Sequence, residues 1–185
     1  MLDNPEPDCW LHPDVEVRPS SIAGEGLFAR APIAAGMVVS RLGGHLVTWP
    51  VLKDLLDSAA RQPDRPYIDT IAVTETLHLV LPPGRPNGKG NHSCEPNLWW
   101  VDAYILAARR DIKRGEELTN DYGTSTAGSD FRMPCRCRSA LCRGVVTGGD
   151  WQLAELRRRY GMHWVPALLE LISRHEPPCQ TDHHR

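Results

Sequence analysis

The chain has 185 residues, of which 41% are hydrophobic and 24% are charged, and its formal net charge is −2. This length suits one domain with at most a small appendage, and it is enough to bury a core without disulfide bonds. The near-neutral charge argues against a protein that coats nucleic acid, and no apolar run approaches the roughly 18 residues of a membrane span, so we expect no direct nucleic-acid binding and no membrane.

Short strands dominate the secondary structure expected for the first 125 residues. Residues 1–14 are polar and Pro-rich, which favours an extended arm. Apolar runs bounded by Gly, Pro and polar residues predict strands at 37–42, 45–47, 67–73, 76–81, 98–101 and 103–108, and a further short strand that ends within 118–123. We therefore expect a mainly β (β-rich α+β) fold.

Helical spacing of apolar residues occurs in three segments. Residues 51–61 follow Pro50, a suitable first-turn proline, and residues 150–160 and 164–175 form two more candidates near the end. The composition then suggests the following division: an N-terminal arm at 1–14, a main domain at 15–125, a linker with a cysteine motif at 126–144, a C-terminal helical appendage at 145–176 and a flexible tail at 177–185.

The six cysteines are unevenly distributed. They are Cys9, Cys94, Cys135, Cys137, Cys142 and Cys179. The N-terminus, MLDNPEPDCW, is acidic and is no secretory signal, so a disulfide framework is the weaker interpretation. Three cysteines stand in CRCRSALC at 135–142, and such alternating thiols in a reducing compartment suggest zinc ligands.

Three motifs gain meaning from their order and spacing. They are GEGLFA at 24–29, NHSCEPN at 91–97 and GEELTNDYG at 115–123. Together they resemble the SET domain of protein-lysine methyltransferases, and CxCx4C at 135–142 is similar to the post-SET zinc motif of that family. The resemblance implies a SET fold of small sheets with a knot-like threaded C-terminal segment, a SET domain at 15–125 and a post-SET motif at 126–144.

The resemblance implies an S-adenosylmethionine site and its residues. Glycines allow backbone groups to approach the amino-acid end of the cofactor closely, which suits the first motif. Family positions assign the cofactor to Gly24, Glu25, Gly26, Asn91, His92, Tyr122 and Leu141.

Two tyrosines are implied as catalytic, and one residue is implied in product specificity. Tyr122 matches the active-site tyrosine, which orients the neutral lysine amine, and Tyr67 matches a second tyrosine at the lysine channel. Asn120 stands where the family commonly has Phe or Tyr, so we expect room for di- or trimethylation. Glu117 and Asp121 are expected to be structural hydrogen-bonding groups rather than bases.

The family pattern also completes the metal site. Cys135, Cys137 and Cys142 supply three thiolates, and the resemblance implies that Cys94 is the fourth ligand of one structural zinc. Gly88-Lys89-Gly90 replaces the Arg-aromatic-aliphatic run that many members have before the second motif. Arg157-Arg158-Arg159 is expected to be a solvated helix face.

The leading hypothesis is a protein-lysine N-methyltransferase that uses S-adenosylmethionine, carries structural zinc and acts on a protein or peptide lysine. The alternative is a catalytically weak or inactive SET module that binds a peptide or partner protein, and a third interpretation is a small-molecule or ribosomal-peptide methyltransferase. Only three of the 21 basic residues are Lys, which hints at a bacterial, cytoplasmic protein; a eukaryotic one would be nuclear.

Overall fold

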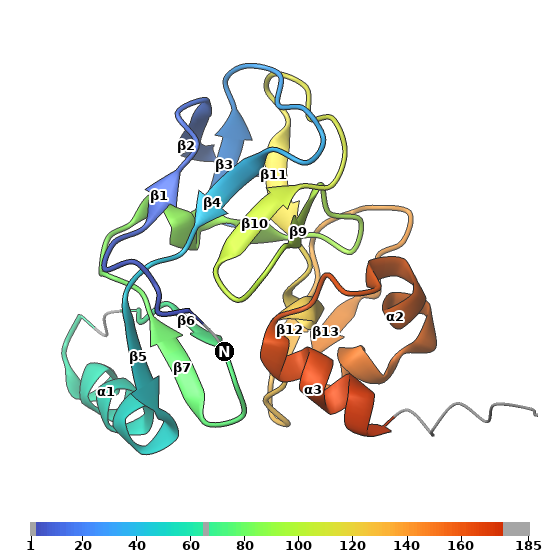
Figure 1. The fold of residues 1–185 in the computed structure, drawn as a ribbon. Coiled ribbons are helices and arrows are strands. Elements are labelled where there is room, and N and C mark those ends of the chain that lie inside the picture. The colour runs from blue at the N-terminus through green and yellow to red at the C-terminus, as the bar shows by residue number, and fades with distance from the viewer. Residues whose placement is uncertain (1–2, 65–66, 176–185) are drawn as a thin grey trace, which may run out of the picture.

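The computed structural model describes residues 3–64 and 67–175, and these residues form small β-sheets with few helices (Figure 1). This arrangement confirms the mainly β fold expected from the sequence. The strands of the described part are β1 Trp10–Leu11, β2 Val15–Pro19, β3 Glu25–Ala29, β4 Val38–Arg41, β5 His45–Thr48, β6 Thr70–Ala72, β7 Leu77–Val80, β8 Asn91–His92, β9 Leu98–Trp100, β10 Ile105–Ala108, β11 Glu117–Asn120, β12 Arg132–Pro134 and β13 Val145–Thr147. The α-helices are α1 Trp49–Arg61, α2 Ala154–Tyr160 and α3 Pro166–His175. The expected tail at 177–185, with Cys179, lies outside the described residues.

Strands between residues 10 and 120 form two four-stranded sheets. One has the order β1-β4-β10-β9 and the other has the order β2-β3-β11-β8. In the second sheet, β11 pairs antiparallel with β3 and parallel with β8, so a late strand lies between two earlier ones. This placement puts β11 between the strand of the first motif, β3, and the Asn91-His92 strand, so all three sequence motifs meet in this sheet.

A third sheet carries the predicted first helix. Its order is β5-β7-β6, and α1 contacts β5 and β7. The helix predicted at 51–61 is confirmed, although it begins at Trp49 with Pro50 in the first turn. Leu52 and Ala59 are its buried residues, which is the spacing of one helical face.

The C-terminal helices differ from the prediction at their starts. The helix predicted over 150–160 is divided into a 3-10 turn at Asp150–Gln152 and α2, because Leu153 between them is extended. The helix predicted over 164–175 begins at Pro166. Proline lacks an N–H group and disfavours helical backbone in the residue before it, so it stands naturally at a helix start.

The C-terminal helices share a hydrophobic core with the sheets. One buried cluster joins Leu79 of β7 and Trp100 of β9 to Leu156, Trp164 and Leu168 from the C-terminal region. Trp164 is 1% exposed. In Figure 1, α2 and α3 lie together beside β12 and β13, at the opposite side of the molecule from α1. The C-terminal helical segment is therefore packed into the main hydrophobic core and is not a separate appendage.

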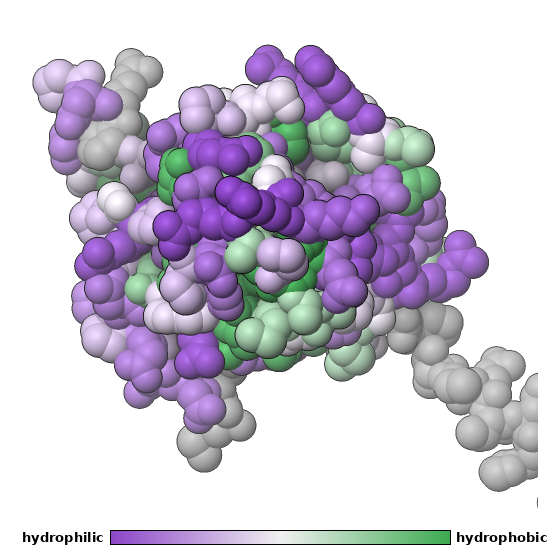
Figure 2. Space-filling model, turned by 90° about the horizontal axis from the view of Figure 1, so that it is seen from above, coloured by the Kyte–Doolittle hydropathy of each residue, from purple (hydrophilic) through white to green (hydrophobic). Residues whose placement is uncertain are grey.

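The cysteine-rich segment contains a hairpin that the sequence did not predict. β12 pairs antiparallel with β13, with Met133 opposite Val146, so this ladder crosses the boundary expected at residue 144. Strands of two or three residues carry too little periodicity to be recognised in a sequence. Figure 2 shows the molecule from above: hydrophilic residues cover most of the face turned to the viewer, and apolar residues appear in patches between them.

Candidate active site and metal centre

The first glycine motif is held against the side chain of Asn91. The Asn91 Nδ2 group donates to the carbonyl oxygens of Ala23 and Glu25, at 3.1 and 3.0 Å, and it lies 2.8 Å from a carboxylate oxygen of Glu117. An added Cβ on Gly26 would lie 2.2 Å from that Glu117 oxygen. The close approach therefore requires glycine at this position.

The outer side of the same turn is open. Gly24 has a φ of +47°, in the left-handed region that favours glycine, and nothing lies within 4 Å of the position of an added Cβ. Lys89 Nζ lies 3.0 Å from Glu25 Oε2 and joins the turn to the 88–90 segment. Residues 88–90, where many family members have an aromatic and aliphatic run, therefore contribute an ion pair to the glycine turn instead.

His92 lies between the catalytic tyrosine candidate and a cysteine. The backbone N–H of Tyr122 donates to His92 Nδ1 at 3.1 Å, and His92 Nε2 lies 3.3 Å from Cys94 Sγ. Burial lowers the pKa of His92 to about 4, so the ring is neutral near pH 7. Because Nδ1 accepts a hydrogen bond, the ring proton is on Nε2 and points at the sulfur.

Tyr122 presents a neutral phenol to a cavity. Its hydroxyl donates to the Gly90 carbonyl oxygen at 2.8 Å. Burial, together with smaller electrostatic contributions from Tyr67 and Asp69, raises the pKa of Tyr122 to about 12. The cavity has a volume of about 340 Å³, and Tyr67, Asn120 and Tyr122 all line it. The structure therefore brings the two tyrosine candidates and the specificity candidate together.

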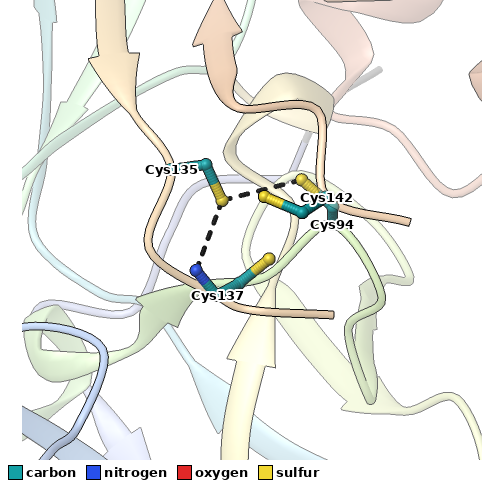
Figure 3. A group of neighbouring side chains, drawn as sticks. All are labelled: Cys94, Cys135, Cys137 and Cys142. Carbon is teal, nitrogen blue, oxygen red and sulfur yellow. Dashed lines mark hydrogen bonds between the residues drawn. The ribbon is translucent and has the colours of Figure 1, made fainter. Parts of the chain in front are cut away.

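Four cysteines form one cluster (Figure 3). The sulfur atoms of Cys94, Cys135, Cys137 and Cys142 all lie within 4.8 Å of one another, and those of Cys94 and Cys135 are 3.7 Å apart. A tetrahedral zinc with Zn–S bonds of about 2.3 Å has sulfur–sulfur separations of about 3.8 Å. The four thiols therefore fit a metal ion of this kind.

Backbone N–H groups donate hydrogen bonds to the sulfur atoms of the cysteine cluster. The backbone N–H of Cys137 donates to Cys135 Sγ at 3.5 Å, and that of Arg143 donates to Cys94 Sγ at 3.3 Å. Such N–H groups stabilise metal-bound thiolates and fix their orientation. Cys9 lies apart from the cluster, where its Sγ is 3.6 Å from the Gly43 carbonyl oxygen.

A buried ion pair connects the cysteine cluster to Tyr122. Arg143 follows the last cysteine, and its NH1 and NH2 groups lie 2.7 and 2.6 Å from the two carboxylate oxygens of Asp121. Its Nε donates to Asp150 Oδ2 at 3.0 Å. Burial raises the pKa of Asp121, but the hydrogen bonds and charge of Arg143 outweigh it, so the net shift is downward. Asp121 is therefore ionised and, as expected, has a structural role.

The C-terminal end of α2 joins the same network. Tyr160 donates to Asp121 Oδ2 at 2.8 Å, and the NH1 group of Arg159 donates to the Cys94 carbonyl oxygen at 2.9 Å. Arg159 also pairs with Glu155, and only 14% of its side chain is exposed. The expectation that residues 157–159 form a solvated face is therefore wrong for Arg159. No local pattern marks this residue, because its partner lies 65 positions away.

Two predicted site residues lie at the surface. Tyr67 is 85% exposed at the cavity, and Leu141, beside the last cysteine, is 45% exposed. Sequence reasoning missed Arg143, Asp150 and Tyr160. The one sequence signal for Arg143 was its place directly after Cys142.

Comparison with known proteins gives consistent results. A family model described as the SET domain matches residues 24–123. The chain is 33% identical over 158 residues to the Drosophila melanogaster protein named histone-lysine N-methyltransferase ash1, which covers 78% of this chain. It is 32% identical over 146 residues to human histone-lysine N-methyltransferase 2B, which covers 70% of it.

A solved structure shares the fold. The methyltransferase domain of human histone-lysine N-methyltransferase SETMAR superimposes with a TM-score of 0.58 and 25% identity, over 74% of this chain and 58% of that one. This likeness confirms the fold class that the motifs implied. The chain spans only 7% of the length of ash1 and 5% of the length of the human relative.

The network predicts a large effect of removing Arg143. In Arg143→Ala, the buried carboxylate of Asp121 loses its counter-charge, and we expect a loss of about 3–5 kcal/mol in the free energy of unfolding. Urea denaturation followed by circular dichroism measures it. In the control Arg110→Ala, which breaks the exposed pair with Glu116, we expect about 0–1 kcal/mol. Equal losses in the two variants would contradict the role assigned to Arg143.

Proposed function

Because this chain belongs to the SET-domain family, we propose that it is a protein-lysine N-methyltransferase, which transfers a methyl group from S-adenosylmethionine to a lysine side-chain amine. The observation that carries the proposal is the cavity in which the Tyr122 phenol meets Asn120 and Tyr67. The relatives' names support a lysine in a protein, and we propose histones as the first substrate class to test.

The cofactor would lie against the glycine turn. Gly24, Glu25 and Gly26 would supply backbone groups, and the open side of Gly24 leaves space for a ligand. The Asn91 amide nitrogen is engaged by the protein, so its oxygen is the atom left for the ligand. His92 backbone, Tyr122 and Leu141 complete the proposed site. When bound, S-adenosylmethionine supplies a methyl group on a positively charged sulfur.

The protein's part in the reaction is mainly positioning. A free lysine side chain has a pKa of about 10.4, and desolvation in the cavity lowers it, so the amine can lose its proton to water. The neutral Tyr122 phenol, whose hydroxyl is fixed by the Gly90 carbonyl, then orients the amine. The amine so oriented would accept the methyl group that bound S-adenosylmethionine supplies, with the carbon–sulfur bond breaking as the carbon–nitrogen bond forms.

We predict that Tyr122→Phe abolishes most of the transfer. Loss of a positioned hydroxyl is expected to slow methylation of histone H3 by about 10²–10⁴-fold, while cofactor affinity stays within a few fold. Labelled-methyl transfer gives the rate, and isothermal calorimetry gives the affinity. Tyr104→Phe is the matched control, since the Tyr104 hydroxyl has no hydrogen-bond partner in the described part of the chain and does not line the cavity.

The same measurements separate the alternative function. A native protein that binds no cofactor and labels neither histone H3 nor any protein of a lysate would be a SET module that acts by binding, the alternative that the departures at Asn120 and residues 88–90 raise. Tyrosine-independent labelling would also contradict the proposed mechanism.

We propose that the cysteine cluster holds one structural zinc. Four protein thiolates fill a tetrahedral shell, so the ion would have no open position for chemistry. It would hold the segment around Cys135–Cys142 against Cys94 and, through Arg143, against the Tyr122 loop.

Metal analysis tests this proposal. We expect about one zinc per chain by plasma mass spectrometry, and we expect its loss in the double variant Cys94→Ser/Cys135→Ser because two of four ligands are removed. Cys9→Ser should keep the native metal content. Unchanged zinc in the double variant would show that these thiols are not ligands.

Asn120 is proposed to widen the lysine pocket. It is buried and lines the cavity, where an amide occupies less space than an aromatic ring. We predict that intact-mass analysis of histone H3 at exhaustion shows di- or trimethyl product, and that Asn120→Tyr stops at fewer methyl groups. Only monomethyl product from the native protein would refute the wider pocket.

No helix in the described part of the chain is long and apolar enough to cross a bilayer. The relatives reported above come from a fly and a human and give no support to a bacterial source. A nuclear place of action fits histone substrates, and a cytoplasmic one fits a bacterial substrate protein.

A further inference from the structure

Asp69 places a carboxylate in the cavity beside Tyr122. It lies directly before β6, and its backbone carbonyl accepts a hydrogen bond from Leu81 at 3.0 Å. Its side chain lies against the α-carbon of Gly88, where an added Cβ would be 2.2 Å from Asp69 Oδ2. The absence of a side chain at Gly88 therefore leaves the space that the Asp69 carboxylate occupies.

The rest of the cavity carries no formal charge. The other described residues that line it are apolar, or carry neutral groups such as the Tyr122 phenol and the Asn120 amide. A single carboxylate in a neutral, partly desolvated cavity produces a negative potential that is concentrated there. The cavity is therefore built for a positively charged group.

Among the described residues, the Asp69 side chain has no partner of its own. Within residues 3–64 and 67–175, no hydrogen bond or ion pair reaches its side chain, and the nearby Lys89 is paired with Glu25. Burial raises the pKa of Asp69, while the charge of Lys89 lowers it. An unpaired, half-buried carboxylate is costly in a folded protein, and such groups are typical of sites that wait for a ligand.

We propose that Asp69 is a specificity-determining residue that receives the ammonium group of the incoming lysine. The inference rests on the proposed function, because it takes the cavity as the lysine channel. Attack requires the neutral amine, so the contact belongs to capture of the charged side chain and precedes methyl transfer. The proton then leaves to water at the open end of the cavity, where Tyr67 is exposed.

Steady-state kinetics test the proposal. In Asp69→Asn we expect KM for histone H3 to rise about 10- to 100-fold, the size of a lost charge-assisted hydrogen bond, while kcat changes about twofold or less. The difference should shrink as ionic strength rises, and Asp69→Glu should recover part of it. Asp54→Asn, which removes an exposed carboxylate of α1 that does not line the cavity, is the charge-matched control.

A binding measurement keeps the inference separate from catalysis. Calorimetry compares an H3 tail peptide that contains lysine with the same peptide carrying norleucine at that position. We expect the native protein to prefer the lysine peptide, and Asp69→Asn to lose this preference while keeping native cofactor affinity. Equal affinities of the native protein for the two peptides, or an unchanged KM in Asp69→Asn, would overturn the role of Asp69. A native protein that shows the Asp69-dependent preference but transfers no methyl group would refute only the proposed activity.

Discussion

The pair between Arg143 and Asp121 is the contact on which the rest of the site depends. Asp121 is 1% exposed and directly precedes Tyr122, and Arg143 directly follows the last cysteine of the cluster. The Asp121 side chain is fully buried and only 13% of the Arg143 side chain is exposed, so the carboxylate depends on this guanidinium for its counter-charge. The position of Tyr122 and that of the cysteine-rich segment are therefore set by one interaction.

The same carboxylate, that of Asp121, also anchors the C-terminal helices. Tyr160 donates to Asp121, and Arg159 donates to the Cys94 carbonyl, while Trp164 is buried beside Trp100. Apolar burial supplies most of the stabilisation of such a helix pair, and the polar contacts fix its register against the site. The C-terminal helices, to which the sequence assigned no chemistry, therefore contact both the segment before Tyr122 and the cysteine cluster.

Sequence reasoning succeeded where the signal is local or carried by a motif. The helix α1, the strands β4, β5, β7 and β10 and the grouping of Cys135, Cys137 and Cys142 could be predicted from periodicity and spacing, and the resemblance to the SET family added Cys94. It failed for β8, which pairs with the distant β11, for the three-residue strands β12 and β13, which are too short to show a periodicity, and for Arg143, whose partner lies 22 positions away. Asp69 belongs to no recognisable sequence motif, and its place among the residues that line the cavity is visible only in the structure.

The central place of β11 has a consequence for how the chain reaches this structure. The strand lies between β3 and β8, so the second sheet cannot close until residues 117–120 are available, long after the first strands have left the ribosome. Such non-local pairing gives a high contact order and slow folding, with unpaired strand edges exposed in the meantime. Nascent chains that end before β11 should therefore be the species most prone to aggregate and to engage chaperones during synthesis.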